Sequence, residues 1–454
     1  MKKKLISILC CSAMTISLLA GCGQTGGESA EAQPDNSTDK ATEEVSEGSE
    51  ETVADEETAK AETTEATKEI TIVHYLTETA KLKAFDDLVA GFEAAHPDIK
   101  VNAESMPMDN YSDVVKLRFS TGEQPDIIFG QPKTFSDLVG SGLIRDLSDQ
   151  PFVDALLDSS KQSVTIDNGI YGIPLDQMAN VVFYNKDIFE AQGLSVPTTY
   201  EEFIDTCEKL KAAGITPCAA GYQDNISFGA NWYTIFYGTK YLNHPTSSKD
   251  LMEGASLADF PEYAQALEQW RTIMNNYQND DRKQVDTATA EQMFANGETA
   301  MIIIGTWGLG AIMDYNPDGN FGGFAYPSES NAADVSVPVA IDDCWMVAKD
   351  SANEENALLF LEYATTKEAN ATWCGDCSQL SALKDVECDT LPPAAIDIAN
   401  EIANKPGSAW ASIATFVGQF DTAYANCNRD FAMDDNRTPE EYIEQFDNEF
   451  AAAR

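Results

Sequence analysis

Strand and helix patterns alternate at the start of the folded part of the chain, and this alternation constrains the fold more than any other feature. EITIVHYL (residues 69–76) is β-branched and predicts a strand, and TAKLKAFDDLVAGFEAAHP then has apolar residues at helical spacing. DIKVNAESM predicts a second strand, YSDVVKLRFSTGEQ a helix ending near Gly122, and PDIIFG a third strand. This alternation predicts the α/β class, with a mainly parallel sheet and helices on both faces.

The later part of the chain continues in the same style. Asn168-Gly169 predicts a hairpin turn, VVFYN a strand, and KDIFEAQGL a short helix that stops at Gly193. In PTTYEEFIDTCEKLKAAGI, Thr199 is placed to cap a helix that Gly214 closes. Four more segments follow: PEYAQALEQWRTIMNN, AEQMFANGETAMIIIGTW, DDCWMVAKD and NEENALLFLEYATT. The whole body is long for one hydrophobic core, so we expect two lobes.

The amino end has the pattern of a bacterial lipoprotein signal. Three lysines at residues 2–4 precede an apolar run, residues 5–19, that is too short for a comfortable membrane span. Leu-Ala-Gly-Cys at residues 19–22 resembles a lipobox, in which the Cys22 thiol receives a diacylglycerol and residues 1–21 are removed. The alternative is an ordinary cleaved signal beside an accidental cysteine. We expect a mature chain that begins at a lipidated Cys22, because two or more acyl chains anchor a protein stably.

An acidic segment follows Cys22. Residues 23–68 contain 14 acidic residues, 3 lysines and no aromatic residue, so they cannot bury enough apolar surface to offset the entropy of ordering. We expect residues 22–68 to form a disordered tether; the alternative is a helix of Ala and Glu. The formal charge of the chain is −46, which argues against nucleic acid or anionic lipid as a partner. Membrane contact is therefore expected only through the lipid anchor.

The cysteines and acidic turns provide weak signals for a metal or redox site. Seven cysteines remain after the signal and Cys22, so at least one stays unpaired within the chain. WCGDCSQ contains a Cys-x-x-Cys near Cys388, but no second such motif or partnered His accompanies it, so buried thiols with one or two bridges are favoured.

DYNPDG matches half of the pattern of a calcium-binding loop. The twelfth position of that pattern requires Glu but is Ala325 in this chain, so an acidic turn is favoured over a calcium site. We expect no metal and no cofactor.

Six stretches of the chain carry a resemblance to a known family. In order they are HPDIKV, STGEQPDIIFG, SGLIRDLSD, YGIPLDQMANVVFYNKDIFEAQGLSVPTTYEEF, FANGETAMIIIGTW and MVAKDSANEENALLFLEYATT. From about Glu69 to its end, the chain resembles extracellular solute-binding proteins of family 1, the carbohydrate-uptake type similar to maltodextrin-binding proteins. These proteins feed ABC importers.

The resemblance implies a two-lobed periplasmic-binding-protein-like fold of type II, which closes on its ligand by a hinge motion. Three crossings join the lobes, and they should fall at Asp176–Val182, Val337–Ile341 and Lys384–Leu391. The implied boundaries are residues 69–178 and 341–387 for the N-lobe, and residues 179–340 and 388–454 for the C-lobe.

Candidate ligand residues follow from what a sugar needs. Sugars present apolar faces and a ring of hydroxyls, so their sites combine aromatic platforms with carboxylates and amides. Trp307 follows AMIIIGT, where the family commonly places a stacking tryptophan, and Trp232 lies in the loop-like stretch GANWYTIF. One carboxylate of Asp342 and Asp343 should face the cleft, while Trp345 beside them is a candidate whose type more often packs in the core. For each tryptophan the alternative is packing alone.

Further candidates rest on the crossings and on the strand-end rule. Asp176 and Gln177 lie at the first crossing, where both lobes can reach a ligand, and Asn180 is a weaker candidate. Ligands of parallel sheets bind beyond the carboxyl ends of the strands, so the residues after the first and third strands are candidates. These are Tyr75, Thr77, Glu78, Gln131 and Lys133. The alternative is a solvated residue at the cleft edge. Two more tryptophans could serve as platforms, Trp373 and Trp410, whereas Trp270 has core spacing.

These features predict a binding protein without enzyme activity. We expect a monomer, held by its lipid on the extracellular face of a single-membrane (Gram-positive) cell, that captures an oligosaccharide and delivers it to an ABC permease. One alternative is a secreted glycoside hydrolase, which would need two placed carboxylates across the scissile bond. Another is a binder of a different solute, such as a peptide or polyamine.

Overall fold

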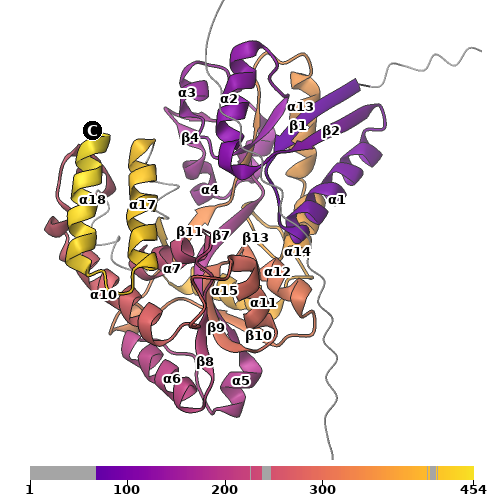
Figure 1. Ribbon diagram of the computed structural model, residues 1–454. Helices are drawn as coiled ribbons and strands as arrows, with labels where there is room; N and C mark the ends of the chain where they lie inside the picture. The colour runs from indigo at the N-terminus through magenta and orange to yellow at the C-terminus, as the bar shows by residue number, and fades with distance from the viewer. Residues whose placement is uncertain (1–67, 225, 238–246, 406, 410–415, 417) are drawn as a thin grey trace, which may run out of the picture. The chain divides into compact units, whose positions relative to one another are not determined.

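The computed structural model describes residues 68–454 except 225, 238–246, 406, 410–415 and 417 (Figure 1). The described residues belong to one compact unit. The predictions for the signal, for Cys22 and for the acidic tether lie outside the described residues, and so does Trp410.

The first sheet contains the predicted strand–helix alternation. Its strands lie in the order β2-β1-β3-β12-β6. Their bounds are β1 Lys68–His74, β2 Ile99–Ser105, β3 Ile127–Gly130, β6 Ile173–Pro174 and β12 Cys344–Val347. Strand β1 pairs in parallel with β2 and β3, whereas β12 is antiparallel to both β3 and β6. The helices α1 (Thr79–Ala95) and α2 (Tyr111–Thr121) connect the parallel strands, as the sequence predicted.

The second sheet forms around one long strand, β7 (Asp176–Asn185). Its order is β14-β11-β7-β9-β8, and β10 and β13 also pair with β7. The other strands are β8 Thr216–Ala219, β9 Thr299–Gly305, β10 Phe321–Phe324, β11 Val337–Ile341, β13 Leu380–Ser381 and β14 Gly407–Ala409. Only β8–β9 and β11–β14 are parallel pairs. Both sheets are therefore mixed rather than mainly parallel, because β11 runs antiparallel to β7 and β12 antiparallel to β3.

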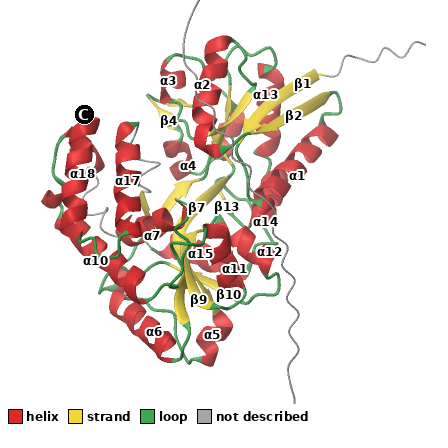
Figure 2. Cartoon of the chain, viewed as in Figure 1, coloured by secondary structure: helices red, strands yellow, loops and turns green. Residues whose placement is uncertain are grey.

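Helices flank the strands of both sheets (Figure 2). The remaining helices are α3 Ser136–Gly140, α4 Asp158–Ser163, α5 Lys186–Ala191, α6 Tyr200–Ala212, α7 Ile226–Tyr237, α9 Ser247–Glu253, α10 Pro261–Asn276, α11 Thr287–Ala295, α12 Gly308–Tyr315, α13 Glu354–Ala364, α14 Lys367–Cys377, α15 Pro393–Asn404, α17 Gln419–Met433 and α18 Pro439–Ala453. The predicted cap of α6 is present, since the Thr199 side chain accepts a hydrogen bond from the Glu202 amide. Gly214 follows that helix with φ of 78°.

Two local predictions were wrong. The hairpin between β4 (Thr165–Ile166) and β5 (Gly169–Ile170) turns at Asp167 and Asn168, whose φ values are 49° and 68°. The turn thus begins one residue earlier than predicted, because Asp and Asn tolerate the left-handed conformation and leave Gly169 in the strand. GANWYTIF is not loop-like but lies within α7, where the apolar residues of a buried helix outweigh its single glycine.

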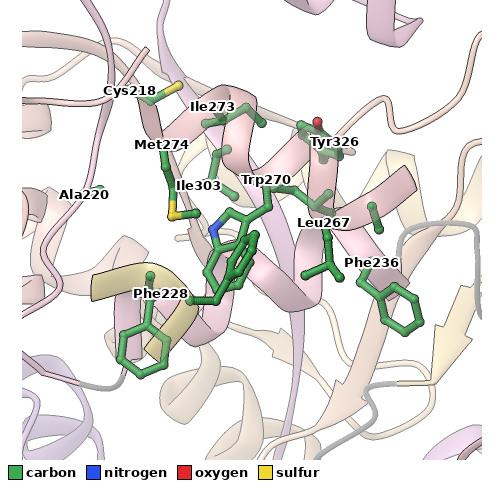
Figure 3. Close-up of a cluster of buried hydrophobic side chains, with 14 of the residues drawn as sticks. Cys218, Ala220, Phe228, Phe236, Leu267, Trp270, Ile273, Met274, Ile303 and Tyr326 are labelled. Atoms are coloured by element: carbon green, nitrogen blue, oxygen red, sulfur yellow. The ribbon is translucent and has the colours of Figure 1, made fainter. Parts of the chain in front are cut away.

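Separate hydrophobic cores cover the two sheets. Phe85, Phe92 and Trp345 belong to the core on the first sheet, and Trp270 to a core on the second. Trp270 is fully buried, as its spacing in the sequence predicted, with its ring centroid 5.3 Å from that of Phe431. Figure 3 shows it among side chains of α7, α10 and β9.

The chain passes between the sheets at three places. Strand β6 of the first sheet leads directly into β7 of the second. Strand β11 of the second sheet leads through Asp342 and Asp343 into β12 of the first. Later, Leu383 packs in the core of the first sheet, and Leu391 packs against a core of the second. These passages bring residues from distant parts of the sequence to the boundary between the sheets.

Candidate functional site

A cavity of about 390 Å³ lies where these passages meet. Its volume is in the range of small-molecule sites, ~300–1,000 Å³. Part of the lining comes from the segments that follow β1 and β3, and another part from α7 and from Trp307, the residue just before α12. Its lining is Tyr75, Leu76, Thr77, Glu78, Lys81, Met108, Phe129, Gln131, Thr134, Met178, Ile226, Gly229, Ala230, Trp307, Asp342 and Asp343.

The cavity brings together several of the predicted ligand residues. Those that line it are Tyr75, Thr77, Glu78, Gln131, Trp307, Asp342 and Asp343. The strand-end rule found Glu78 and Gln131 because β1 and β3 are parallel neighbours, so their carboxyl ends meet at one edge of the sheet. The rule therefore worked where the sheet is parallel.

Trp307 occupies its place because of a glycine. A Cβ added to Gly305 would lie 1.5 Å from Cζ3 of Trp307, so the indole lies over the end of β9 where any other residue would collide with it. The ring is partly exposed and borders the cavity just before α12 begins. The indole thus contributes an aromatic surface to the cavity lining, which suits the apolar face of a sugar.

A buried ion pair supports the polar wall. Lys81 lies one turn into α1, is only 6% exposed, and pairs with the Asp342 carboxylate. Burial opposes the charge of Lys81, but Asp342 and Asp176 raise its pKa well above the usual value. Buried charges are tolerated when they are paired in this way, and removal of one partner is costly.

Asp343, the residue after Asp342, lines the cavity next to the hydroxyl group of Tyr75. The Tyr75 hydroxyl donates a hydrogen bond to its Oδ2. Burial and the neighbouring charge of Asp342 raise the pKa of Asp343 to about 7. Gln131 borders the same point, and its Nε2 donates to the Asp342 carbonyl at 2.7 Å. The wall therefore carries a hydroxyl, a carboxyl and an amide in fixed positions.

Asp176 and Gln177 lie at the first passage but do not line the cavity. Asp176 is 2% exposed, and its Oδ2 accepts a hydrogen bond of 2.8 Å from Trp373 Nε1. Burial and Asp342 raise the pKa of Asp176 to about 7. The Gln177 side chain donates to the Ser381 carbonyl at 2.7 Å and so joins β7 to β13. Both residues support the passage rather than border the cavity.

Trp345 and Trp373 also lie outside the lining. Trp345 is fully buried, with its ring centroid 4.5 Å from that of Phe129, which does border the cavity. Trp373 is 2% exposed and packs in the same core. Neither ring offers a free face, because each strand or helix turns it toward the first-sheet core.

The last three predicted residues lie elsewhere. Lys133 lines a neighbouring cavity, and burial lowers its pKa. Asn180 is fully buried in β7, and within the described part of the chain no hydrogen bond reaches its side-chain amide. Trp232 has its backbone in α7, but its side chain lies outside the described residues.

The sequence reasoning missed the apolar part of the lining. Met108 is 62% exposed and Ile226 is 45% exposed, and both border the cavity together with Met178. Exposed large apolar side chains at a cavity are typical of a binding surface. Lys81 was missed as well, although extending the strand-end rule into the first turn of the following helix would have found it.

The Cys-x-x-Cys motif is part of the core. Cys374 and Cys377 are buried free thiols on α14, and burial raises the pKa of both. Cys377 Sγ donates to the Trp373 carbonyl at 3.0 Å. Among the described residues, no group of three or more His, Cys, Asp or Glu side chains could hold a metal ion. In the same part of the chain, no helix combines the length and apolarity that crossing a membrane requires.

Comparisons with known proteins show the family of this chain. The multiple sugar-binding protein of Streptococcus mutans is 23% identical over 343 residues, which cover 74% of this chain and 80% of that protein. The galactooligosaccharide-binding protein of Bacillus subtilis is 24% identical, with 68% and 72% covered. A solved structure of RafE in complex with raffinose superposes with a TM-score of 0.74 at 20% identity, covering 85% of this chain and 99% of RafE. Residues 77–371 match the family of bacterial extracellular solute-binding proteins, and the chain belongs to that family.

Proposed function

We propose that this protein captures a carbohydrate in the cavity between its two sheets and delivers it to an ABC importer. One observation carries the proposal: the partly exposed Trp307 ring lines the same cavity as the polar side chains of Glu78, Gln131 and Asp343. An aromatic surface opposite carboxyl, amide and hydroxyl groups matches the apolar face and hydroxyl ring of a sugar. The two relatives whose names specify sugars, and the raffinose complex of RafE, support the same ligand class.

The proposed lobes follow the two sheets except at the passages, where β13 and the first residues of β7 pair in the second sheet but fall within the N-lobe ranges. We assign residues 69–178 and 341–387 to an N-lobe, and residues 179–340 and 388–454 to a C-lobe. Asp342 and Asp343 lie between β11 and β12, so they belong to a passage between the lobes and to the cavity lining at once. A ligand that contacts them and Trp307 would bind the closed arrangement better than the open one, and would shift the population toward it.

The polar wall favours binding over catalysis. A glycoside hydrolase needs one carboxyl group free to protonate a leaving oxygen and a second free to act on the other side of the bond. Three carboxyl groups line this cavity: Asp342 is paired with Lys81 and Asp343 accepts a hydrogen bond from the Tyr75 hydroxyl, so Glu78 has no second unengaged carboxyl group among the lining residues. We therefore propose a protein that binds its sugar without cleaving it.

We further propose that the protein is a monomeric lipoprotein on the extracellular face of the cell membrane. Cys22 would carry the acyl chains, and residues 22–68 would space the folded body from the membrane. A charged, aromatic-free segment suits this role because it repels itself and stays extended. The closed form would then dock on the membrane permease.

Calorimetry tests the central proposal. The purified protein is titrated with mono- to hexasaccharides of several linkage series, and each mixture is analysed for cleavage products. We expect one series to bind and to remain intact. Trp307→Ala should weaken that binding at least tenfold, which corresponds to about 1.4 kcal/mol of binding free energy. Leu143→Ala, an exposed apolar position remote from the cavity, serves as control. Failure of every series to bind would refute the sugar assignment, and cleavage would refute the binding class.

A further inference from the structure

A second cavity of about 540 Å³ adjoins the first. Its walls come from α2, from the segment between β3 and α3, and from the start of α17. Gln131 and Thr134 line both cavities. A ligand that extends past these two side chains therefore passes from one cavity into the other without leaving the surface of the protein.

The side chain of Gln131, which lines both cavities, is held in one position. Its Nε2 is held by the Asp342 carbonyl at 2.7 Å, and the residue is 9% exposed. Thr134, by contrast, is exposed, two residues before α3 begins. The boundary thus consists of one fixed amide and one small exposed hydroxyl residue, which leaves room for a chain of sugar units to continue across it.

The second cavity has the polar chemistry that a sugar needs. Ser112 on α2 and Ser136 on α3 contribute hydroxyls, and Lys116 pairs with Asp137 at 3.2 Å. Asp421 lies in the first turn of α17, where its carboxyl group is exposed at the cavity edge. Lys133 and Phe416 also line the cavity, so it offers hydroxyl groups, charged groups of both signs and an aromatic ring, which can donate to, accept from and pack against sugar units. The lining is therefore compatible with neutral sugar units.

The start of α17 closes this cavity from the side opposite α2. Gly418 borders it with φ of 58° and ψ of −126°, a conformation open to glycine but strained for other residues. This glycine lets the chain turn sharply into α17 at the cavity edge. The second cavity, like the first, thus has walls from segments far apart in the sequence.

We propose that the second cavity is a subsite for the outer units of the ligand, so that the protein selects oligosaccharides too long for the first cavity alone. The proposal rests on the proposed function and adds the place where the outer units of the sugar bind and through which the protein senses its length. The inner units would stack on Trp307, and the outer units would lie between α2 and the start of α17. Each added unit that enters the second cavity should then strengthen binding until that cavity is filled.

The test uses the same linkage series and a variant that fills the second cavity. Ser136→Trp places a large ring there from an exposed position at the first residue of α3. Ser141→Trp is the matched control, because Ser141 is also exposed, caps the other end of α3 and lines neither cavity. Ser112→Trp fills the cavity from α2, and Ser120→Trp is its control on an exposed part of that helix. Thermal unfolding of each variant establishes that it is folded.

We expect the unaltered protein to bind the longest members of its series at least about tenfold more tightly than the shortest. Ser136→Trp should remove this gain while leaving the affinity for the short members unchanged, and Ser141→Trp should keep it. Equal affinity for short and long members would overturn the subsite while leaving the proposed function intact. An equal loss for short and long sugars in the filling variants would also overturn it. Failure of every series to bind would overturn both proposals.

Discussion

Lys81 of α1 and Asp342, between β11 and β12, form a buried ion pair that borders the ligand cavity. The two residues are 261 positions apart in the sequence. Lys81 belongs to the first segment that follows β1, whereas Asp342 lies on the passage between the two sheets. The pair therefore couples the first helix of the body to the passage on which hinge closure would depend.

Breaking this ion pair should destabilise the protein. Lys81→Met leaves the Asp342 carboxylate buried without its cation, and we expect a loss of about 3–5 kcal/mol in the free energy of unfolding. The double variant Lys81→Met, Asp342→Leu removes both charges and should recover most of that loss. Urea denaturation measures all three values. A double variant as unstable as Lys81→Met would contradict this account of the pair.

Stability should also depend on the Asp176 carboxyl between about pH 4 and pH 7. Burial raises its folded-state pKa to about 7, while an unfolded Asp has a pKa of about 3.9. In this window the folded state binds more protons than the unfolded state, so the contribution of Asp176 to stability falls as the pH rises. Each unit of pKa difference corresponds to about 1.4 kcal/mol.

Asp176→Asn tests this dependence, because an amide oxygen can still accept the hydrogen bond from Trp373 Nε1. We expect the variant to gain stability relative to the unaltered protein as the pH rises from 4 to about 7. Asp167→Asn, at the exposed hairpin turn, is the control and should shift the profile little. Parallel stability profiles for Asp176→Asn and the unaltered protein would show that Asp176 does not titrate in this window.

Gly305 should control ligand affinity through Trp307. Gly305→Ala would place a Cβ 1.5 Å from the indole, so the ring must move from its position at the cavity. We expect sugar affinity to fall by about as much as in Trp307→Ala, and the double variant to be no worse than either single one. Calorimetry of the three variants gives this cycle. Additive losses would mean that Gly305 acts on binding by a separate route.

Cys22→Ser should release the protein from the membrane. Without a thiol at this position no diacylglycerol can be attached, and the acyl chains that hold the protein are lost. We expect the unaltered protein in the membrane fraction with an acyl mass on its first residue, and the variant in the medium or uncleaved. An unaltered mature protein without acyl chains at Cys22 would contradict the lipoprotein assignment.

Local structure could be predicted from the sequence where short-range physics decides it. The strands and helices from β1 to β3 follow from hydrophobic period and β-branching, and the cap at Thr199 from its spacing to Glu202. The parallel pairing of β1 with β3 was enough to place Glu78 and Gln131 at one cavity. The predictions for the turn at Asp167 and for the segment containing Trp232 were wrong. The sequence patterns of these two segments fit two conformations, and packing selects between them.

The tertiary structure alone decided what each of the three aspartates at the passages between the sheets contacts. Asp176, Asp342 and Asp343 look alike in the sequence, yet Asp176 binds Trp373 in the core, Asp342 pairs with Lys81, and Asp343 faces Tyr75. Met108 and Ile226 carry no signal of function until the fold places them at the same cavity. The sequence determined the family and the order of the elements, because these depend on residues near one another in the chain. The cavity depends on passages between two sheets that join residues hundreds of positions apart, and no local pattern encodes that distance.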